Sequence, residues 1–266
     1  MVSRPTSHTP TALWPPDDTE ESIVGVDRHQ HDITSLRIGL IEEAHRRAAG
    51  GPLPWQTISQ VKLVGCQRPD GSRYDVLPDI MIFPRPLDDT LGSYSLREHG
   101  VPVLIVEVAS DSTYRADLDG RRGKGWSYAH AGVAEYLVLD PTGQFVPELG
   151  RGWRLVDGVY QPWAVDARGR WVSEQVVGVA IGIEDGLAAV YGADGRRHLR
   201  EGEVGAALQA ERISGQVEGK RAMLRQLVRL RFGEVAALER RIDTADEADL
   251  DALTGRLLTA AGPAEL

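Results

Sequence analysis

The stretch that decides the fold is residues 103–108, Val-Leu-Ile-Val-Glu-Val, which follows a second apolar run at residues 80–83, Ile-Met-Ile-Phe. Short apolar runs bounded by turn residues predict strands that are buried on both faces. Weak helical periodicity predicts a helix over residues 114–131 that ends at Gly132, and residues 136–139 predict another strand. The order strand, helix, strand is typical of an α/β core.

The flanking sequence extends this core in both directions. Apolar residues at helical spacing predict a first helix over residues 30–49, and the Gly-Gly-Pro sequence that follows ends it. The other expected elements are a strand over 58–64, a hairpin turn at 68–72, several short strands over 145–191 and helices from about residue 195 onward. The sequence thus predicts three parts: a flexible arm over 1–20, a main α/β domain over 21–195 and a helical tail over 196–266.

Composition narrows the classes of function. The chain has 266 residues, a net charge of −9 and one cysteine, Cys66. A single cysteine excludes an internal disulfide and a thiolate zinc site. No apolar run is long enough to cross a bilayer, so we expect no membrane partner and a cytoplasmic location. The negative charge argues against wide, non-specific binding to nucleic acid, which needs basic surface.

Two acidic residues lie in apolar surroundings. Glu107 is inside the most hydrophobic predicted strand, where alternation places it on one face with Val103 and Ile105. Asp79 lies at the mouth of the neighbouring predicted strand. A buried carboxylate needs a partner, and two adjacent carboxylates repel unless a cation or a proton lies between them. Mg²⁺ suits such a pair, although each acid could instead form a salt bridge or cap a backbone group.

These residues also carry a family resemblance. The runs PDIMIF, VPVLIVEVASDST and AGVAEYLVLDP, with a lysine before a tyrosine between the last two, resemble the Uma family of restriction endonucleases, a branch of the PD-(D/E)xK nucleases. The likeness covers roughly residues 20–190. Asp79, after Pro78, matches the first acid of the family. Glu107 matches the second, within a Glu-Val-x-Ser element that includes Ser110.

The resemblance implies further site residues. Lys124, four residues before Tyr128, matches the catalytic lysine, which this family carries on the helix after the strand. Asp79, Glu107 and the backbone carbonyl of Val108 are the implied ligands of Mg²⁺, with Mn²⁺ as an alternative metal. Lys124 would then orient the attacking water or stabilise charge on the phosphate.

Other residues take supporting roles in the same picture. His29 and Gln30 look like the His-Gln element of the family at the opening of the first helix, and His29 is expected at the edge of the site. A local hydrogen bond explains this histidine equally well. Ser110 and Tyr128 are expected to support the site by hydrogen bonding. The arginines near Lys124 are the candidates for contact with the DNA backbone: Arg115, Arg121 and Arg122.

Glycines surround the expected lysine. Lys124 lies between Gly123 and Gly125, and each glycine inside a helix costs about 1 kcal/mol of helix stability. The direction of the lysine is therefore the least defined part of the predicted site. In the tail, three arginines lie four residues apart on one helix face and predict a charged, solvated surface rather than a phosphate contact: Arg221, Arg225 and Arg229.

The fold that the resemblance implies is of restriction-endonuclease type: a mixed central sheet flanked by helices, followed by a β-rich continuation and the helical tail. The leading hypothesis is a Mg²⁺-dependent endonuclease that acts on DNA. A second is a catalytically silent module with a nuclease fold that binds partners. A third, a glycoside hydrolase, is disfavoured because Trp153, Trp163 and Trp171 are far from the acids in sequence. A homodimer formed through the tail is expected, because cutting both strands of a duplex usually needs two active sites.

Overall fold

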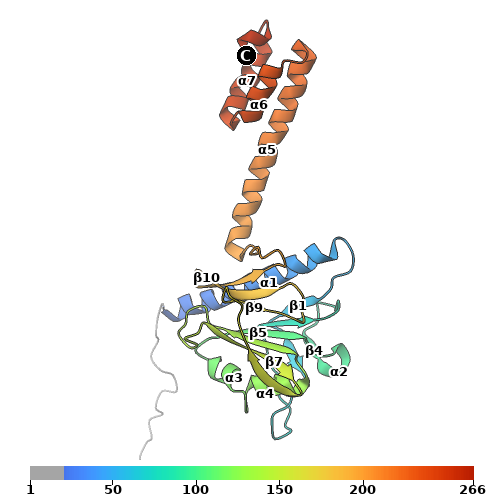
Figure 1. The fold of residues 1–266 in the computed structure, drawn as a ribbon, viewed down its shortest axis with the longest axis vertical. Coiled ribbons are helices and arrows are strands. Elements are labelled where there is room, and N and C mark those ends of the chain that lie inside the picture. The colour runs from blue at the N-terminus through green and yellow to red at the C-terminus, as the bar shows by residue number, and fades with distance from the viewer. Residues whose placement is uncertain (1–20) are drawn as a thin grey trace, which may run out of the picture. The chain divides into compact units, whose positions relative to one another are not determined.

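The computed structural model describes residues 21–266, so the arm expected over residues 1–20 lies outside the described part of the chain. The chain forms two compact units, of which the first ends at Glu201 and the second spans Gly202–Leu266 (Figure 1). Each unit has its own hydrophobic core. Among residues 21–266, no helix is both long enough and apolar enough to cross a membrane.

The first unit is built on a mixed sheet of six strands in the order β1-β3-β5-β6-β7-β8. Strands β5 and β6 are parallel and the other neighbours are antiparallel, which agrees with the mixed sheet predicted from the sequence. The parallel pair requires a crossover connection, and helices α3 and α4 provide it. The six strands are β1 (Gln56–Ser59), β3 (Ile80–Phe83), β5 (Leu104–Val108), β6 (Glu135–Leu139), β7 (Gly150–Val156) and β8 (Val159–Trp163).

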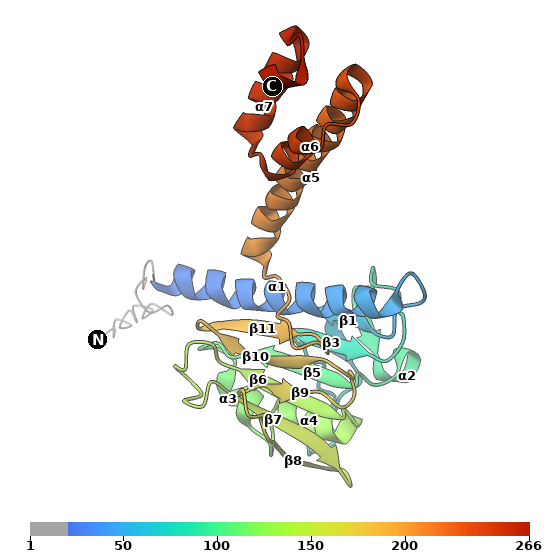
Figure 2. The same ribbon diagram turned by 45° about the horizontal axis from the view of Figure 1, so that its top comes forward.

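Two smaller sheets and four helices complete this unit. One small sheet pairs β2 with β4 in parallel, and the other has the antiparallel order β11-β10-β9. Figure 2 shows α1 along one side of the main sheet and α3 and α4 on the other. Their bounds are α1 (Glu21–Ala48), β2 (Lys62–Val64), β4 (Ser93–Ser95), α2 (Leu96–His99), α3 (Tyr114–Leu118), α4 (Lys124–Ala131), β9 (Trp171–Val172), β10 (Ala180–Glu184) and β11 (Leu187–Tyr191).

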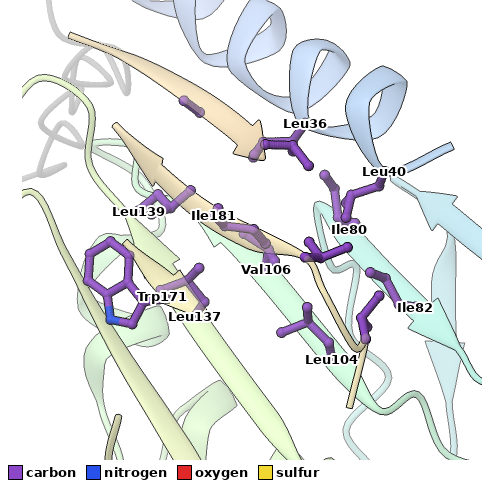
Figure 3. Packing of buried hydrophobic residues seen from close by; sticks show 14 of the residues in the cluster. Leu36, Leu40, Ile80, Ile82, Leu104, Val106, Leu137, Leu139, Trp171 and Ile181 are labelled. Atoms are coloured by element: carbon purple, nitrogen blue, oxygen red, sulfur yellow. The ribbon is translucent and has the colours of Figure 1, made fainter. Parts of the chain in front are cut away.

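One face of the main sheet is covered by α1 and the β9–β11 sheet. Leu36 and Leu40 of α1 pack against Ile80 and Val106, with Ile181 of β10 in the same cluster (Figure 3). All five side chains are fully buried. Burial of a large aliphatic side chain contributes about 1.5–3 kcal/mol, so this layer is a major source of the stability of the unit.

The opposite face of the sheet is covered by α4 and the β2–β4 sheet. Ile105 of β5 belongs to this second cluster together with Tyr128 of α4 and Tyr94 of β4. All five residues of β5 are therefore buried, alternately toward one cluster and the other. Coverage on both faces explains why this strand is an unbroken apolar run with a single charged residue, Glu107.

A buried carboxylate fastens α1 to the end of the β10–β11 hairpin. Glu43 accepts hydrogen bonds from Arg46 (2.7 Å) and Arg47 (2.8 Å), and its Oε2 lies 3.1 Å from Nε2 of His198. The Glu43 side chain is fully buried. Burial raises the pKa of this carboxyl, but the arginine hydrogen bonds and charges lower it to about 2 overall. The ionised form of Glu43 is therefore part of the folded structure.

The strand predicted over residues 58–64 is wrong as a single element. The chain instead forms β1 and β2, which belong to different sheets. The break is at Gln60, which has a φ of 54° and donates its backbone N–H to Asp79 O at 3.1 Å. This left-handed residue turns the chain out of the main sheet, so that β2 can pair with β4.

The helix predicted over residues 114–131 is also wrong as a single element. It is broken into α3 and α4 by a loop that contains Gly120 and Gly123. A Cβ atom on Gly123 would lie 2.2 Å from Ala116 O, closer than any real contact, so the turn requires glycine there. The glycines that weaken a continuous helix therefore end one helix and allow a second to begin at Lys124.

The second unit consists of three helices and a short terminal turn. Leu224 and Val228 of α5 pack with residues of α6 and α7 into one cluster. The arginines of the predicted stripe are ion-paired inside this unit: Arg225 Nη2 lies 2.5 Å from Asp243, and Arg229 Nε lies 2.6 Å from Glu239. The bounds are α5 (Glu201–Phe232), α6 (Ala236–Thr244), α7 (Glu247–Thr259) and a 3-10 turn (Pro263–Glu265).

Candidate active site

Asp79 and Glu107 lie opposite each other at the ends of two adjacent strands. Ile80 pairs with Val106 in the antiparallel register of β3 and β5, which brings the preceding Asp79 beside Glu107. The backbone N–H of Asp79 donates to Glu107 Oε2 at 3.3 Å, and the backbone N–H of Val108 donates to Asp79 Oδ2 at 2.8 Å. The sequence predicts this juxtaposition, because both acids follow from the positions of the two strands.

Glu107 lies on the face of β5 that packs against α4. Its side chain is 1% exposed, and its two oxygens contact different groups. The Tyr128 hydroxyl donates to Oε1 at 2.7 Å, and Lys124 Nζ lies 3.0 Å from Oε2. Burial raises the pKa of Glu107, against the opposing effect of the Lys124 charge and with a further rise from Asp79.

Lys124 is the first residue of α4 and points back into the sheet. Its Nζ lies 3.0 Å from Glu107 Oε2 and 2.8 Å from Asp117 Oδ1, and its side chain is 12% exposed. Burial alone would lower the pKa of this amine, but the charges of the two carboxylates raise it overall. The structure thus brings together three of the predicted residues, namely Lys124, Glu107 and Tyr128.

Asp117 is a member of the cluster that the sequence did not reveal. Its side chain is fully buried in α3, and burial raises the pKa of its carboxyl. A continuous helix would place residues 117 and 124 two turns apart, too far for this contact. The contact exists because the α3–α4 loop folds the chain back on itself. The signal in the sequence was the pair Gly120 and Gly123, because two glycines so close together can indicate that a helix ends and a second one begins.

His29 approaches the carboxylates from α1. Its Nε2 lies 3.0 Å from Val108 O and 3.7 Å from Asp79 Oδ2. The nearby Asp79 carboxylate raises the pKa of this histidine against the opposing effect of burial. The sequence predicted that His29 opens the first helix. The helix instead begins at Glu21, so His29 lies inside it. The supporting role of His29 at the edge of the site stays a prediction.

A cleft of about 630 Å³ opens beside these residues. Its lining includes His29, Val108 and the loop residues Ser110 and Thr113. Neither Asp79 nor Glu107 is among its lining residues. Ser110 Oγ lies 2.9 Å from Thr113 Oγ1, so this predicted supporting residue orders the cleft wall and does not contact the acids. No tryptophan lines the described cleft, and Phe145 is its one aromatic residue, which gives little surface for stacking a sugar.

The predicted DNA-contacting arginines lie outside the carboxylate cluster. Arg115 Nε donates to the Tyr114 hydroxyl at 2.9 Å. Arg121 and Arg122 are exposed in the α3–α4 loop, where their backbone N–H groups donate to Asp119 Oδ1. These arginines therefore lie close to Lys124 along the chain without sharing its ion pairs.

The oxygen atoms of Asp79, Glu107 and Val108 are the groups that could hold a metal. Val108 O and Asp79 Oδ2 both lie within 4 Å of one atom, Nε2 of His29, so they converge on the same small volume. Two carboxylates and a carbonyl are hard oxygen donors of the kind that Mg²⁺ accepts, with waters in the remaining positions. Within residues 28–266, no cluster of three or more His, Cys, Asp or Glu side chains is arranged to hold a metal, so Val108 O would be an essential ligand.

Comparison with protein families gives a match. A family model described as "Uma2: Putative restriction endonuclease" matches residues 23–184, which is well over half of the chain. No curated protein matches the chain. The matched range includes His29, Asp79, Glu107 and Lys124 and runs to the end of β10.

Proposed function

The chain belongs to the Uma2 family of restriction endonucleases, and from this premise we propose that it is a Mg²⁺-dependent endonuclease that hydrolyses DNA phosphodiester bonds. The mixed sheet flanked by helices is a restriction-endonuclease-like fold. The observation that carries the proposal is the pair Asp79 and Glu107, held in register on adjacent strands. Asp79 Oδ2 lies 3.7 Å from Nε2 of His29, which lines the cleft. Two adjacent carboxylates repel each other unless a cation or a proton lies between them, and Mg²⁺ accepts such oxygen ligands.

The protein fixes the orientation of each acid before any ligand arrives. Val108 N–H holds one oxygen of Asp79, and Tyr128 holds one oxygen of Glu107. These contacts preorganise the acids, which lowers the cost of reorganisation when substrate binds. Asp79, Glu107 and Val108 O would hold Mg²⁺ or Mn²⁺. When bound, the metal lowers the pKa of a water and offsets negative charge on the phosphate.

The remaining residues act on the water and the phosphate. Lys124, a cation with three N–H donors, would orient the attacking water or stabilise the charge that develops on the phosphate. His29, between Val108 O and Asp79, would position water or substrate at the cleft edge. Ser110 would support the cleft wall. The exposed arginines Arg121 and Arg122, with Arg115, would contact the DNA backbone.

A second candidate function is a catalytically silent nuclease-fold module. The ion pairing of Lys124 supports it, because this lysine already offsets the charge of Glu107 and Asp117 without a metal. The two functions differ in metal binding: the endonuclease binds a divalent cation beside the ion pairs of Lys124, and the silent module does not. A silent module would bind partners without binding a divalent metal at Asp79.

We also propose that two copies associate through residues 202–266, because cleavage of both DNA strands usually needs two active sites. Three exposed apolar residues of α5 support this arrangement. Met223, Leu227 and Leu230 follow each other at i, i+4 and i+7, which places them on one helix face.

The decisive experiment is cleavage of supercoiled plasmid by the purified full chain with Mg²⁺ or Mn²⁺. Relaxed and linear products should form, and a chelator should prevent them. Single-stranded RNA in the same assay distinguishes a ribonuclease from the proposed DNA endonuclease. Persistent cleavage in the presence of chelator would instead indicate metal-independent hydrolysis. Absence of both cleavage and metal binding would leave the silent module as the function.

A further inference from the structure

Lys124 is held by two carboxylates that come from different elements. Asp117 Oδ1 on α3 lies 2.8 Å from its Nζ, and Glu107 Oε2 on β5 lies 3.0 Å away. Both carboxylates are buried, with side chains at most 1% exposed. A buried carboxylate is retained at such a place when it is paired or has a function.

The chain is shaped to place Asp117 beside the lysine. Gly123 lies against Ala116 O, so that α4 begins directly next to α3. Asp119 caps the intervening turn through the backbone N–H groups of Arg121 and Arg122. On the sheet side, the Tyr136 hydroxyl donates to Asp117 O at 2.8 Å. The backbone around Asp117 is therefore fixed from two directions.

The two partners of Lys124 differ in what else they can do. Glu107 lies beside Asp79 and is a ligand in the proposed metal site. Asp117 contacts the lysine from the side of α3 through an ion pair, and neither of its buried carboxylate oxygens has a hydrogen-bond partner in the described part of the chain. A metal at Glu107 would compete with Lys124 for the same carboxylate oxygens, since both are cations. Asp117 is then the anion that keeps the ammonium group in place.

The choice of lysine at this position also indicates a specific requirement. The chain has 30 basic residues but only three lysines, Lys62, Lys124 and Lys220. Lys62 is exposed, and Lys220 pairs with Glu247 and Asp251 in the second unit. Lysine is a compact cation whose three donors can rotate, whereas arginine presents a planar fork. A small ammonium group fits between two carboxylates and remains free to turn toward a phosphate.

We propose that Asp117 is a positioning residue, whose carboxylate holds the Lys124 ammonium at the active site when Glu107 engages the metal. This inference rests on the proposed function, in which Lys124 acts on the attacking water or on the phosphate. Asp117 does not touch the reacting atoms. It restricts the Lys124 ammonium to its place beside Glu107, 3.0 Å from Oε2.

The first test measures how firmly Lys124 is held, without DNA and without activity. An N-hydroxysuccinimide acetate reagent modifies accessible amines, and mass spectrometry compares Lys124 with exposed Lys62 in the same molecule. Wild-type Lys124 should react far more slowly than Lys62, and Asp117→Asn should raise its relative rate by about tenfold or more. An unchanged rate in Asp117→Asn overturns the proposal.

A second measurement uses the wild-type protein alone and covers the case in which Asp117→Asn does not fold. With saturating Mg²⁺, Lys124 should remain protected, because Asp117 still holds it. If Mg²⁺ releases Lys124 to the rate of Lys62, then Glu107 was its essential partner and the proposal is wrong.

The third test is kinetic and uses a matched control. Asp117→Asn should lower kcat by about 10- to 100-fold with little change in KM, and Asp117→Glu should recover part of the loss. Asp157→Asn makes the same charge change in the exposed β7–β8 turn, where a φ of 50° suits asparagine, and should leave kcat unchanged. Released Lys124 with an unchanged kcat overturns the positioning role. If the wild type cleaves nothing, the proposed function fails, and the labelling alone decides whether Asp117 holds Lys124.

Discussion

The carboxylate of Asp79 accepts a hydrogen bond from the backbone N–H of Val108, the residue directly after Glu107, at 2.8 Å. In return, the backbone N–H of Asp79 donates to Glu107 Oε2. Each acid is thus oriented by the strand that carries the other. The geometry of the pair depends on the register between β3 and β5, which the packed core on both faces of β5 fixes.

Removal of one acid should abolish activity without unfolding the protein. Glu107→Gln keeps the shape of the side chain and an oxygen that can accept from Tyr128, but it removes the charge that would bind Mg²⁺. We expect plasmid cleavage to fall by at least about 100-fold. Because two carboxylates share one lysine, the variant should unfold at a temperature no lower than that of the wild type, as measured by circular dichroism. A large drop in unfolding temperature would mean that the charge of Glu107 is structural.

Metal binding should be visible as a gain in thermal stability. A ligand that binds only the folded state stabilises it by about 2.7 kcal/mol at 100 times its dissociation constant. We expect Mg²⁺ and Mn²⁺ to raise the unfolding temperature of the wild type by several degrees in a thermal shift assay. Asp79→Asn should lose most of this gain. An equal gain in Asp79→Asn would place the metal elsewhere.

Substitution of Lys124 should separate catalysis from metal binding. Lys124→Met removes the ammonium group and keeps much of the buried side-chain volume. We expect kcat for DNA cleavage to fall by about 100-fold or more, while the stabilisation by Mg²⁺ is retained or increased because Glu107 loses its competing cation. Parallel kinetics and thermal shifts test this. Loss of metal binding in Lys124→Met would contradict the assignment of the ligands.

The close approach at Gly123 should make this glycine matter for both activity and folding. Gly123→Ala places a Cβ atom against Ala116 O, so α4 must shift and Lys124 with it. We expect a stability cost of about 1–3 kcal/mol and a loss of cleavage of about tenfold or more. Gly120→Ala is the control, since no atom lies within 4 Å of the added Cβ and its φ is not positive. Equal effects of the two variants would argue against a special role for the turn at Gly123.

The ion pairs of Glu43 should make the fold sensitive to acid. The pKa of Glu43 is about 2 in the folded protein, below its ordinary value of 4.5. A depressed carboxyl pKa contributes stability that is complete above pH 4.5 and is lost as the pH falls toward 2, about 3 kcal/mol in all. Glu43→Gln should therefore lower the free energy of unfolding at pH 7 but have a much smaller effect near pH 2.5. Urea unfolding at the two pH values measures the difference, and an equal loss at both would exclude this origin.

The sequence was sufficient for the parts of the fold that depend on local pattern. Strands β3 and β5 follow from apolar runs, and the parallel neighbour of β5 follows from the strand-helix-strand order. The position of Glu107 on the face of β5 opposite to Val106 follows from alternation along the strand. These features are predictable because they are set by residues close together in the chain.

The sequence was insufficient where the chain reverses over a few residues. The turn at Gln60 and the break before Lys124 arise from tertiary contacts, namely the hydrogen bond to Asp79 O and the packing of Gly123 on Ala116. Asp117 was missed for the same reason, since its contact with Lys124 exists only after the loop has folded back. A glycine lowers the stability of a helix, but the sequence alone does not show whether the helix continues through the glycine or ends at it.

Because side chains alternate along β5, the site should tolerate aliphatic substitutions in this strand better than the insertion or deletion of one residue. Substituting one aliphatic residue of the strand for another would alter the packing volume and leave the acid where it is. Deleting or inserting one residue just ahead of Glu107 would rotate its carboxylate into the aliphatic layer under α1 and present a valine to Tyr128 and Lys124. A frame-preserving indel of a single codon is therefore a more effective way to silence this centre than most missense changes nearby.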